Sequence, residues 1–322
     1  MITINNNMYV LDTDNTSYAF AVLGSGQLEH LYYGRKLHAN EAVMTEKHTF
    51  IPGNTNVYNK DYSSYSLEDV CLEMSSLGKG DIREPFIEVT YPNGSSTTDM
   101  VFDRAEIIQG KEEYDTLPGS YDDNGEVEQL VIYLKDRNYN LTLELHYYVY
   151  EKCDIITRSA KLVNSGNESV RLERLMSMQL DLNESDYELS FFNGAWAREM
   201  NRSRIPIRAG KYVNESVTGT SSNRANPFFM IGRSSTTEDY GECYGFNLIY
   251  SGNHYEAAQV NSYGKLRLVS GINPATFSYI IEAGKCFEAP EAVLTYSYKG
   301  YNRMSHNTVS YTHLTLPTNS LV

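Results

Sequence analysis

The sequence contains no apolar run long enough to span a bilayer, and its N-terminus lacks the basic and apolar segments of a secretory leader. Basic residues are also scarce, because 27 Lys and Arg stand against 41 Asp and Glu and give a formal charge of −14 at pH 7. Proteins that bind nucleic acid or anionic lipid need clustered Lys and Arg. We therefore expect a cytoplasmic protein that binds neutral ligands or other proteins, with no nucleic acid and no membrane among its partners.

Cysteine and histidine are too few and too widely spaced to predict a metal site. The four cysteines form no Cys-x-x-Cys pair, and the seven histidines never lie three to five residues apart. We expect four reduced thiols, with two disulfides as the alternative, and no metal. The Gly-Lys-Gly-Asp-Ile run at residues 78–82 lacks the Gly-Lys-Ser/Thr of a phosphate loop. We interpret it as a tight turn in which Asp81 pairs with Arg83.

Helical periodicity is weak along the chain, whereas the two-residue period of strands is clear. In residues 141–150 the odd positions are Leu, Leu, Leu, Tyr and Val, and polar residues alternate with them up to His146. In residues 170–182 the even positions are Val, Leu, Arg, Met, Met, Leu and Leu, so Arg174 is the one that is not apolar. Residues 164–167, Asn-Ser-Gly-Asn, lie between such runs and predict a turn. The pattern predicts an all-β fold, a large antiparallel sandwich that forms one domain.

Three motifs near the end of the chain form the most specific pattern in the sequence. They are Gly-Glu-Cys-Tyr-Gly-Phe-Asn-Leu-Ile-Tyr-Ser-Gly-Asn-His at 241–254, Gly-Ile-Asn-Pro-Ala-Thr-Phe at 271–277 and Gly-Lys-Cys-Phe-Glu-Ala-Pro-Glu at 284–291. This series resembles the end of the N-terminal domain of glycoside hydrolase family 36, the α-galactosidases. Four earlier segments resemble landmarks of the same family in the same order: 80–85, 154–159, 194–199 and 221–228. The resemblance covers about residues 1 to 306.

The resemblance implies a β-supersandwich of the galactose mutarotase-like type over residues 1–307. It also implies a parent enzyme that hydrolyses terminal α-galactosides with retention, as a homo-oligomer that is a tetramer in the family, using two aspartates of a following barrel and no cofactor. The family's Lys-Trp-Asp and Ser-Cys-Ser-Gly-Gly motifs do not occur here. We therefore predict no catalytic residue and expect the chain alone to be inactive. The alternative is a free-standing carbohydrate-binding or structural β-sandwich.

Residues 308–322 depart from the family pattern. We interpret them as a non-native or disordered tail that buries no core.

Two groups of residues are candidates for the functional surface. Trp196, the only tryptophan, is interpreted either as a platform for a sugar ring or as an anchor between the sandwich and the barrel. Arg198 and Glu199 are expected to form a charged pair at that interface, together with Ser221 and Asn226.

The second group lies in an aromatic-rich segment that begins at His48. Phe50, Tyr58 and Tyr62 are the candidates for substrate contact. In family tetramers, the matching region can reach toward the active site of a neighbouring subunit.

Overall fold

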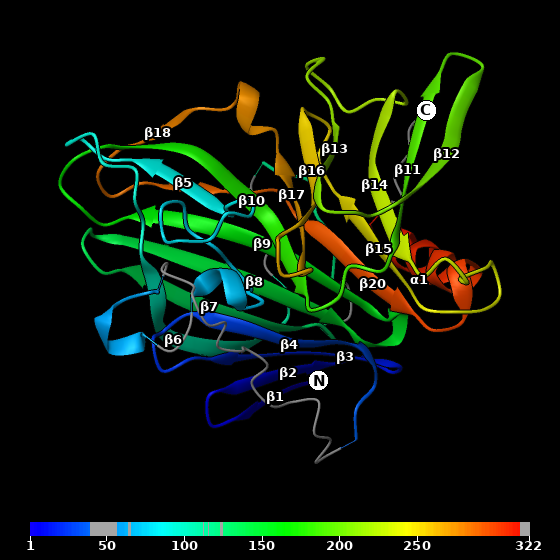
Figure 1. Ribbon diagram of the computed structural model, residues 1–322, viewed down its shortest axis with the longest axis horizontal. Helices are drawn as coiled ribbons and strands as arrows, with labels where there is room; N and C mark the ends of the chain where they lie inside the picture. The colour runs from blue at the N-terminus through cyan, green and yellow to red at the C-terminus, as the bar shows by residue number, and fades with distance from the viewer. Residues whose placement is uncertain (39–56, 64–65, 112, 115, 123–124, 316–322) are drawn as a thin grey trace.

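The computed structural model describes residues 1–38, 57–63, 66–111, 113–114, 116–122 and 125–315, with the side chains of 312–315 left aside. The described residues form three antiparallel sheets, which confirms the predicted all-β sandwich. Figure 1 shows the sheets as broad layers, with the first sheet along the lower side. In the part of the chain that the structure describes, no helix has the length and apolar character to cross a membrane.

The first sheet is a simple meander of four strands in chain order. It consists of β1 (Ile2–Asn5), β2 (Met8–Asp12), β3 (Thr16–Val22) and β4 (Leu28–Arg35).

The second sheet has six strands, and long-range pairings build it. In order across the sheet they are β13 (Gly210–Glu215), β16 (His254–Val260), β17 (Leu266–Ile272), β10 (Val170–Leu182) and β18 (Tyr279–Ile281), while β5 (Ile87–Thr90) also pairs with β10.

The third sheet has ten strands and forms the largest layer. In order they are β12 (Arg198–Pro206), β11 (Glu188–Ala195), β14 (Ala225–Gly232), β15 (Cys243–Leu248), β20 (Ala292–Ser297), β9 (Ile155–Asn164), β8 (Leu141–Tyr150), β7 (Glu128–Asp136) and β6 (Met100–Gln109), and β19 (Cys286–Glu288) pairs with β9.

Helical structure is limited to one α-helix and four short 3-10 helices among the described residues. They are α1 (Gly300–Thr315), η2 (Lys60–Tyr62), η3 (Leu67–Asp69), η4 (Glu151–Cys153) and η5 (Pro274–Thr276).

The two strands predicted in most detail are confirmed as β8 and β10, with the predicted bounds. The odd positions of β8 are buried in the large core cluster to which all three sheets contribute. Its polar positions Thr142, Glu144 and His146 are only half-buried, as alternation along a pleated strand requires. Arg174 interrupts the pattern of β10 because it forms ion pairs with Glu84 and with Glu88.

A buried ionic centre lies between the sheets and explains the Arg at position 158. Arg158 is 1% exposed, and its Nη1 lies 3.1 Å from Oε2 of Glu73. The carboxylate of Glu73 also accepts hydrogen bonds from the hydroxyls of Tyr18 and Tyr147. Burial opposes ionisation of Glu73, but Arg158 and the hydrogen bond from His30 hold its pKa below the ordinary value. The segment 154–159, which contains Arg158 and resembles a family landmark, is therefore part of the core.

The predicted pair of Asp81 and Arg83 is confirmed, with 2.9 Å between Oδ2 and Nη2. It belongs to a larger buried group, because Arg267 lies 2.8 Å from Asp81 and 2.6 Å from Asp181. Two arginines and two aspartates thus balance one another, which is the condition for keeping charges inside a protein.

Of the tail expected at residues 308–322, the structure corrects one part, because residues 308–315 are helical and bury a side chain, while residues 316–322 lie outside the described residues. Helix α1 continues through Thr308 to Thr315, and Tyr311 is only 5% exposed. The ring of Tyr311 packs edge-on against Tyr150, and its hydroxyl donates to Oε1 of Glu291 at 3.2 Å. One face of the helix is therefore part of the domain.

The four cysteines are free thiols, with Cys71 and Cys243 buried and Cys286 exposed. Burial raises the pKa of both Cys71 and Cys243 to about 12. Buried thiols of this kind are protonated and chemically inert.

Candidate functional site

The hairpin of β11 and β12 carries the most exposed large aromatic side chain of the described residues. Trp196 lies in its two-residue turn and is 91% exposed. Gly194 permits the close approach before this turn, since a Cβ there would lie 2.8 Å from the backbone oxygens of Arg198 and Asn223. Ala197 completes the turn with a φ of 59°. The local backbone thus turns the indole away from the sandwich, as Figure 1 shows for the hairpin itself at the upper right.

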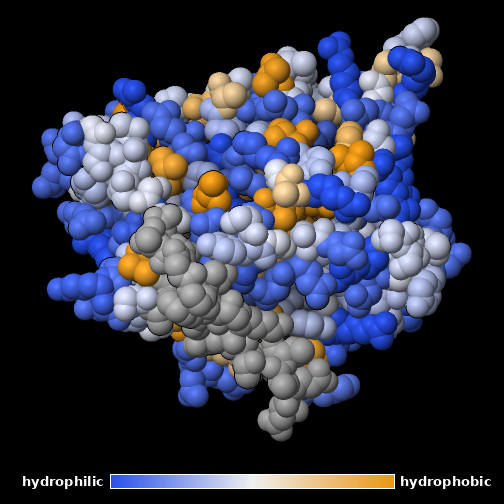
Figure 2. Space-filling view, in the orientation of Figure 1, coloured by the Kyte–Doolittle hydropathy of each residue, from blue (hydrophilic) through white to orange (hydrophobic). Residues whose placement is uncertain are grey.

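Apolar side chains continue from the hairpin onto the neighbouring segments. Met200 is 53% exposed, and its Sδ lies 3.6 Å from Nδ2 of Asn226. The backbone oxygen of Asn226 accepts from Asn214 at the end of β13, next to the exposed Val213. We call this surface the hairpin end, formed by Trp196, Met200 and Asn226. On the face shown in Figure 2, outside the grey atoms, apolar side chains come to the surface as orange spots among polar ones.

A buried group centred on His254 lies beside the hairpin end. Nδ1 of His254 lies 2.9 Å from Oε1 of Glu256, and Nε2 lies 2.9 Å from the backbone oxygen of Ala225. Both ring nitrogens face oxygen atoms, so a protonated, charged ring can donate at both. Burial opposes this charge, but the hydrogen bond and the charge of Glu256 raise the pKa of His254. Burial also raises the pKa of Glu256. The group, with Asn214 bonded to Glu256, joins β13, β14 and β16.

The predicted interface residues lie at or beside the hairpin end. Arg198 is exposed at the start of β12, and the carboxylate of Glu199 accepts from the backbone N–H of Ala197 at 2.9 Å. In the described parts of the chain no ion pair links Arg198 to Glu199, because consecutive residues of a strand point to opposite faces. Ser221 is half-buried, and its backbone N–H donates to Ser251.

The predicted aromatic segment lies apart from the hairpin end. Phe50 falls outside the described residues. Tyr58 is 7% exposed, and its ring packs in a small core cluster. Its hydroxyl donates to Asp99 at 2.8 Å. The hydroxyl of Tyr62 donates to the backbone oxygen of Gly24. In Figure 1 the segment that carries both tyrosines lies far from the hairpin of β11 and β12.

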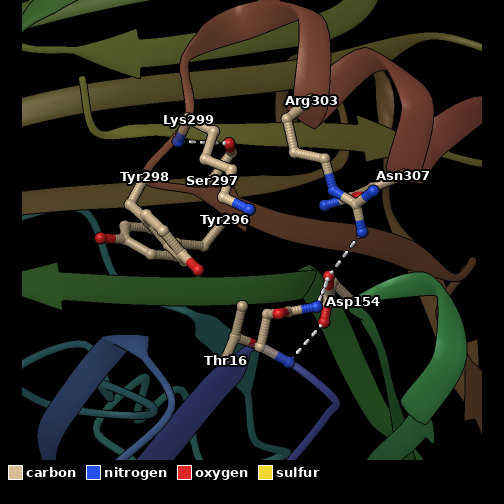
Figure 3. A pocket seen from close by; sticks show the side chains of 9 residues that line it. Thr16, Asp154, Tyr296, Ser297, Tyr298, Lys299, Arg303 and Asn307 are labelled. Atoms are coloured by element: carbon tan, nitrogen blue, oxygen red, sulfur yellow. Dashed lines mark hydrogen bonds and ion pairs between the residues drawn. The ribbon is translucent and has the colours of Figure 1, made fainter. Parts of the chain in front are cut away.

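A pocket of about 210 Å³ lies where the chain leaves the sandwich and enters α1, a feature that sequence reasoning missed. Figure 3 shows Arg303 reaching down from the helix to Asp154, which lies above Thr16. The Nη2 of Arg303 is 3.2 Å from Oδ2 of Asp154. The same carboxylate accepts hydrogen bonds from Thr13 and from the backbone and side chain of Asn15. Asp154 is thus fully engaged and fastens α1 to two sheets.

This pocket does not have the chemistry of a glycosidase active site. Among the described residues that line it, Asp154 is the only one with a carboxylate, whereas retaining hydrolysis needs two carboxyl groups about 5 Å apart. The residues described also hold no group of three or more His, Cys, Asp or Glu side chains arranged to bind a metal. The pocket is a structural joint between the sandwich and the helix.

Comparison with known proteins agrees with the fold and with the motifs. The alpha-galactosidase AgaA of Geobacillus stearothermophilus is 36% identical over 301 residues, which cover 92% of this chain and 40% of that protein. The bifunctional alpha-galactosidase/sucrose kinase AgaSK of Mediterraneibacter gnavus is 34% identical, with 95% of this chain and 33% of that protein covered. The crystal structure of the alpha-galactosidase from Lactobacillus brevis matches with a TM-score of 0.92 at 35% identity, over 97% of this chain and 42% of that one.

The chain therefore spans about two fifths or less of the length of these relatives. The model of the glycosyl hydrolase family 36 N-terminal domain matches residues 26–282. This match covers most of the chain, so the protein belongs to glycosyl hydrolase family 36 and contains the N-terminal domain of that family.

Proposed function

We propose that this chain serves as the N-terminal domain of an α-galactosidase that removes terminal α-linked galactose from oligosaccharides with retention. The relatives named above support this proposal, and structures of AgaA variants in complex with stachyose and with raffinose match the chain with a TM-score of 0.91. In this proposal the two catalytic carboxylates belong to the part of the enzyme that the relatives have beyond the matched region. The domain itself packs against that part and positions it.

The observation that carries the role of the domain is the exposure of Trp196 at the hairpin end. An exposed indole on a projecting hairpin is typical of a protein interface, where tryptophan is enriched among the residues that dominate affinity. Burying a large apolar side chain stabilises an interface by about 1.5–3 kcal/mol. We therefore propose that the hairpin end docks onto the catalytic domain.

The proposal also includes a cytoplasmic homo-oligomer. The four free thiols, one of them exposed at Cys286, suit a reducing compartment. The net charge of −14 keeps such a protein soluble.

The gene provides the first test. In-frame downstream sequence that encodes a Lys-Trp-Asp motif supports the proposal, whereas an authentic stop codon favours a free-standing sandwich. The isolated chain should show no turnover of p-nitrophenyl α-galactoside, since it lacks the pair of carboxylates that double displacement requires. Turnover that a point change in this chain abolishes would refute the assignment.

The second test separates the two interpretations of Trp196 in the full-length enzyme. If Trp196 is an interface anchor, Trp196→Ala should lower stability or assembly and leave KM nearly unchanged. If it is a sugar platform, the same change should raise KM and leave stability unchanged. Trp196→Phe is the matched control, because it keeps an aromatic ring in either role.

A further inference from the structure

A groove of about 300 Å³ lies at the end of the sandwich opposite the hairpin end. Three turns surround it, those that follow β5, β7 and β9, and in Figure 1 the turns after β7 and β9 lie at the left. We call it the asparagine groove, defined by Asn93, Asn138, Tyr139, Asn140, Asn167 and Glu168. Its volume is at the lower limit of sites that hold small ligands.

The turns that form the groove are fixed by hydrogen bonds. Oδ1 of the buried Asp136 accepts from the backbone N–H groups of Asn138 and Tyr139, at 2.8 and 3.0 Å. Nδ2 of Asn164, a residue that is 1% exposed, donates to the backbone oxygen of Glu168 at 2.9 Å. Nδ2 of Asn93 donates to the hydroxyl of Tyr139 at 3.0 Å. The groove is therefore preorganised, which lowers the entropic cost of binding.

Three amide side chains of the groove remain available for a ligand. Asn138, Asn140 and Asn167 are exposed, and within the described residues no hydrogen bond engages their side-chain amides. Each amide offers both a donor and an acceptor, as a sugar hydroxyl does. Glu168 adds a carboxylate that can accept from hydroxyls, and the lining contains no cation. This lining disfavours phosphates and other anions and suits an uncharged polyol.

An aromatic platform lies beside these amides. The ring of Tyr139 stacks on that of Tyr91, with centroids 3.5 Å apart and an interplanar angle of 9°. Tyr91 is only 2% exposed, and its hydroxyl donates to Asp136, so it supports the pair from the protein side. Tyr139 is half-buried and supplies the exposed part of the pair. Such a ring can pack against the C–H face of a pyranose.

We propose that the asparagine groove is a non-catalytic binding site for a neutral oligosaccharide. A pyranose packs on Tyr139, and the amides of Asn138, Asn140 and Asn167 bond its hydroxyls. That the sugar is an α-galactoside rests on the proposed function. Because the groove and the hairpin end lie at opposite ends, this site holds a substrate away from the surface proposed to meet the catalytic domain.

Isothermal titration calorimetry of this chain with melibiose, raffinose and stachyose tests the proposal. We expect saturable, millimolar binding of at least one of these sugars. The triple variant Asn138→Ala, Asn140→Ala, Asn167→Ala should weaken it by about tenfold or more, since several hydrogen bonds are lost. Since no hydrogen bond within the described residues engages these side-chain amides, the circular dichroism spectrum should be unchanged. Asn5→Ala, at an exposed asparagine of β1, and Trp196→Ala should bind as the parent does.

Three results would overturn the proposal. They are the absence of saturable binding, equal binding by the triple variant and the parent, and loss of binding in Trp196→Ala. Binding of cellobiose without binding of any galactoside would support the groove as a neutral sugar site and refute its assignment to α-galactosides. Activity of the full-length enzyme is a separate readout: if the triple variant keeps turnover while binding is absent in the parent chain, the groove proposal fails and the proposed function stands.

Discussion

Replacing Tyr311 by alanine tests whether the end of α1 is part of the domain core. The ring is 5% exposed and packs in a cluster with Val127, Tyr148, Tyr150 and Val293. Truncating a buried aromatic side chain costs about 3–5 kcal/mol, through lost burial and the cavity that remains. We expect the lower limit, about 3 kcal/mol, because a helix near the end of the described chain can relax into the cavity.

The hydroxyl makes a smaller contribution than the ring. It donates to Glu291, whose carboxylate also accepts from Ser120 and forms an ion pair with Lys111. Glu291 keeps these partners in Tyr311→Phe, so that variant should lose only about 1 kcal/mol. The comparison of the two variants separates packing from hydrogen bonding.

Urea unfolding and thermal unfolding of the isolated chain provide the measurement. For a domain of about 300 residues the unfolding entropy is about 0.6 kcal/mol/K, so a loss of 3 kcal/mol lowers Tm by about 5 °C. Deleting residues 308–322 should have at least this effect. His306→Ala, at an exposed position of the same helix, is the control and should change stability by less than about 0.5 kcal/mol. An unchanged Tm in both Tyr311→Ala and the deletion would show that the segment does not pack.

Three further predictions concern other parts of the chain. Trp196→Ala in the isolated chain should change the free energy of unfolding by less than about 0.5 kcal/mol in urea, because the indole is 91% exposed; a loss above about 2 kcal/mol would contradict its placement. Arg158→Met should cost about 3–5 kcal/mol by stranding Glu73, whereas Arg104→Met, at an exposed ion pair, should cost less than about 1 kcal/mol, and equal losses would argue against the buried centre. Because the fold raises the pKa of His254, protonation of this ring stabilises the fold fully at pH values below its ordinary pKa of 6.5, and this stabilisation is lost as the pH rises through the folded-state pKa. The fall in the free energy of unfolding from about pH 6 to pH 9 should therefore be smaller in His254→Gln than in the parent. Identical pH profiles of the two proteins would show that the imidazole is not charged.

Much of the fold can be predicted from sequence, because strand periodicity depends on local alternation of polar and apolar residues. It predicts β8 and β10 with their bounds, and the spacing of Asp81 and Arg83 predicts their pair. Helix α1 escaped this reasoning, although Tyr301, Met304 and Tyr311 lie on one helical face and are buried. Because the helix has so few apolar positions, its helical periodicity is weak in the sequence, and only the surface on which it packs makes it recognisable.

The candidate sites depend more strongly on the tertiary structure. The motifs by themselves indicate the family, and the exposed position of the 194–199 turn is compatible with them. Neither the burial of Tyr58 nor the separation of Arg198 from Glu199 follows from composition. Arg158 meets Glu73 across 85 residues, and His254 meets Ala225 across 29, because the packing of the sheets against one another brings distant segments together. Local sequence thus determined which segments are strands, whereas the register between distant strands decided which charges are buried, which aromatic rings face solvent and which turns enclose a groove.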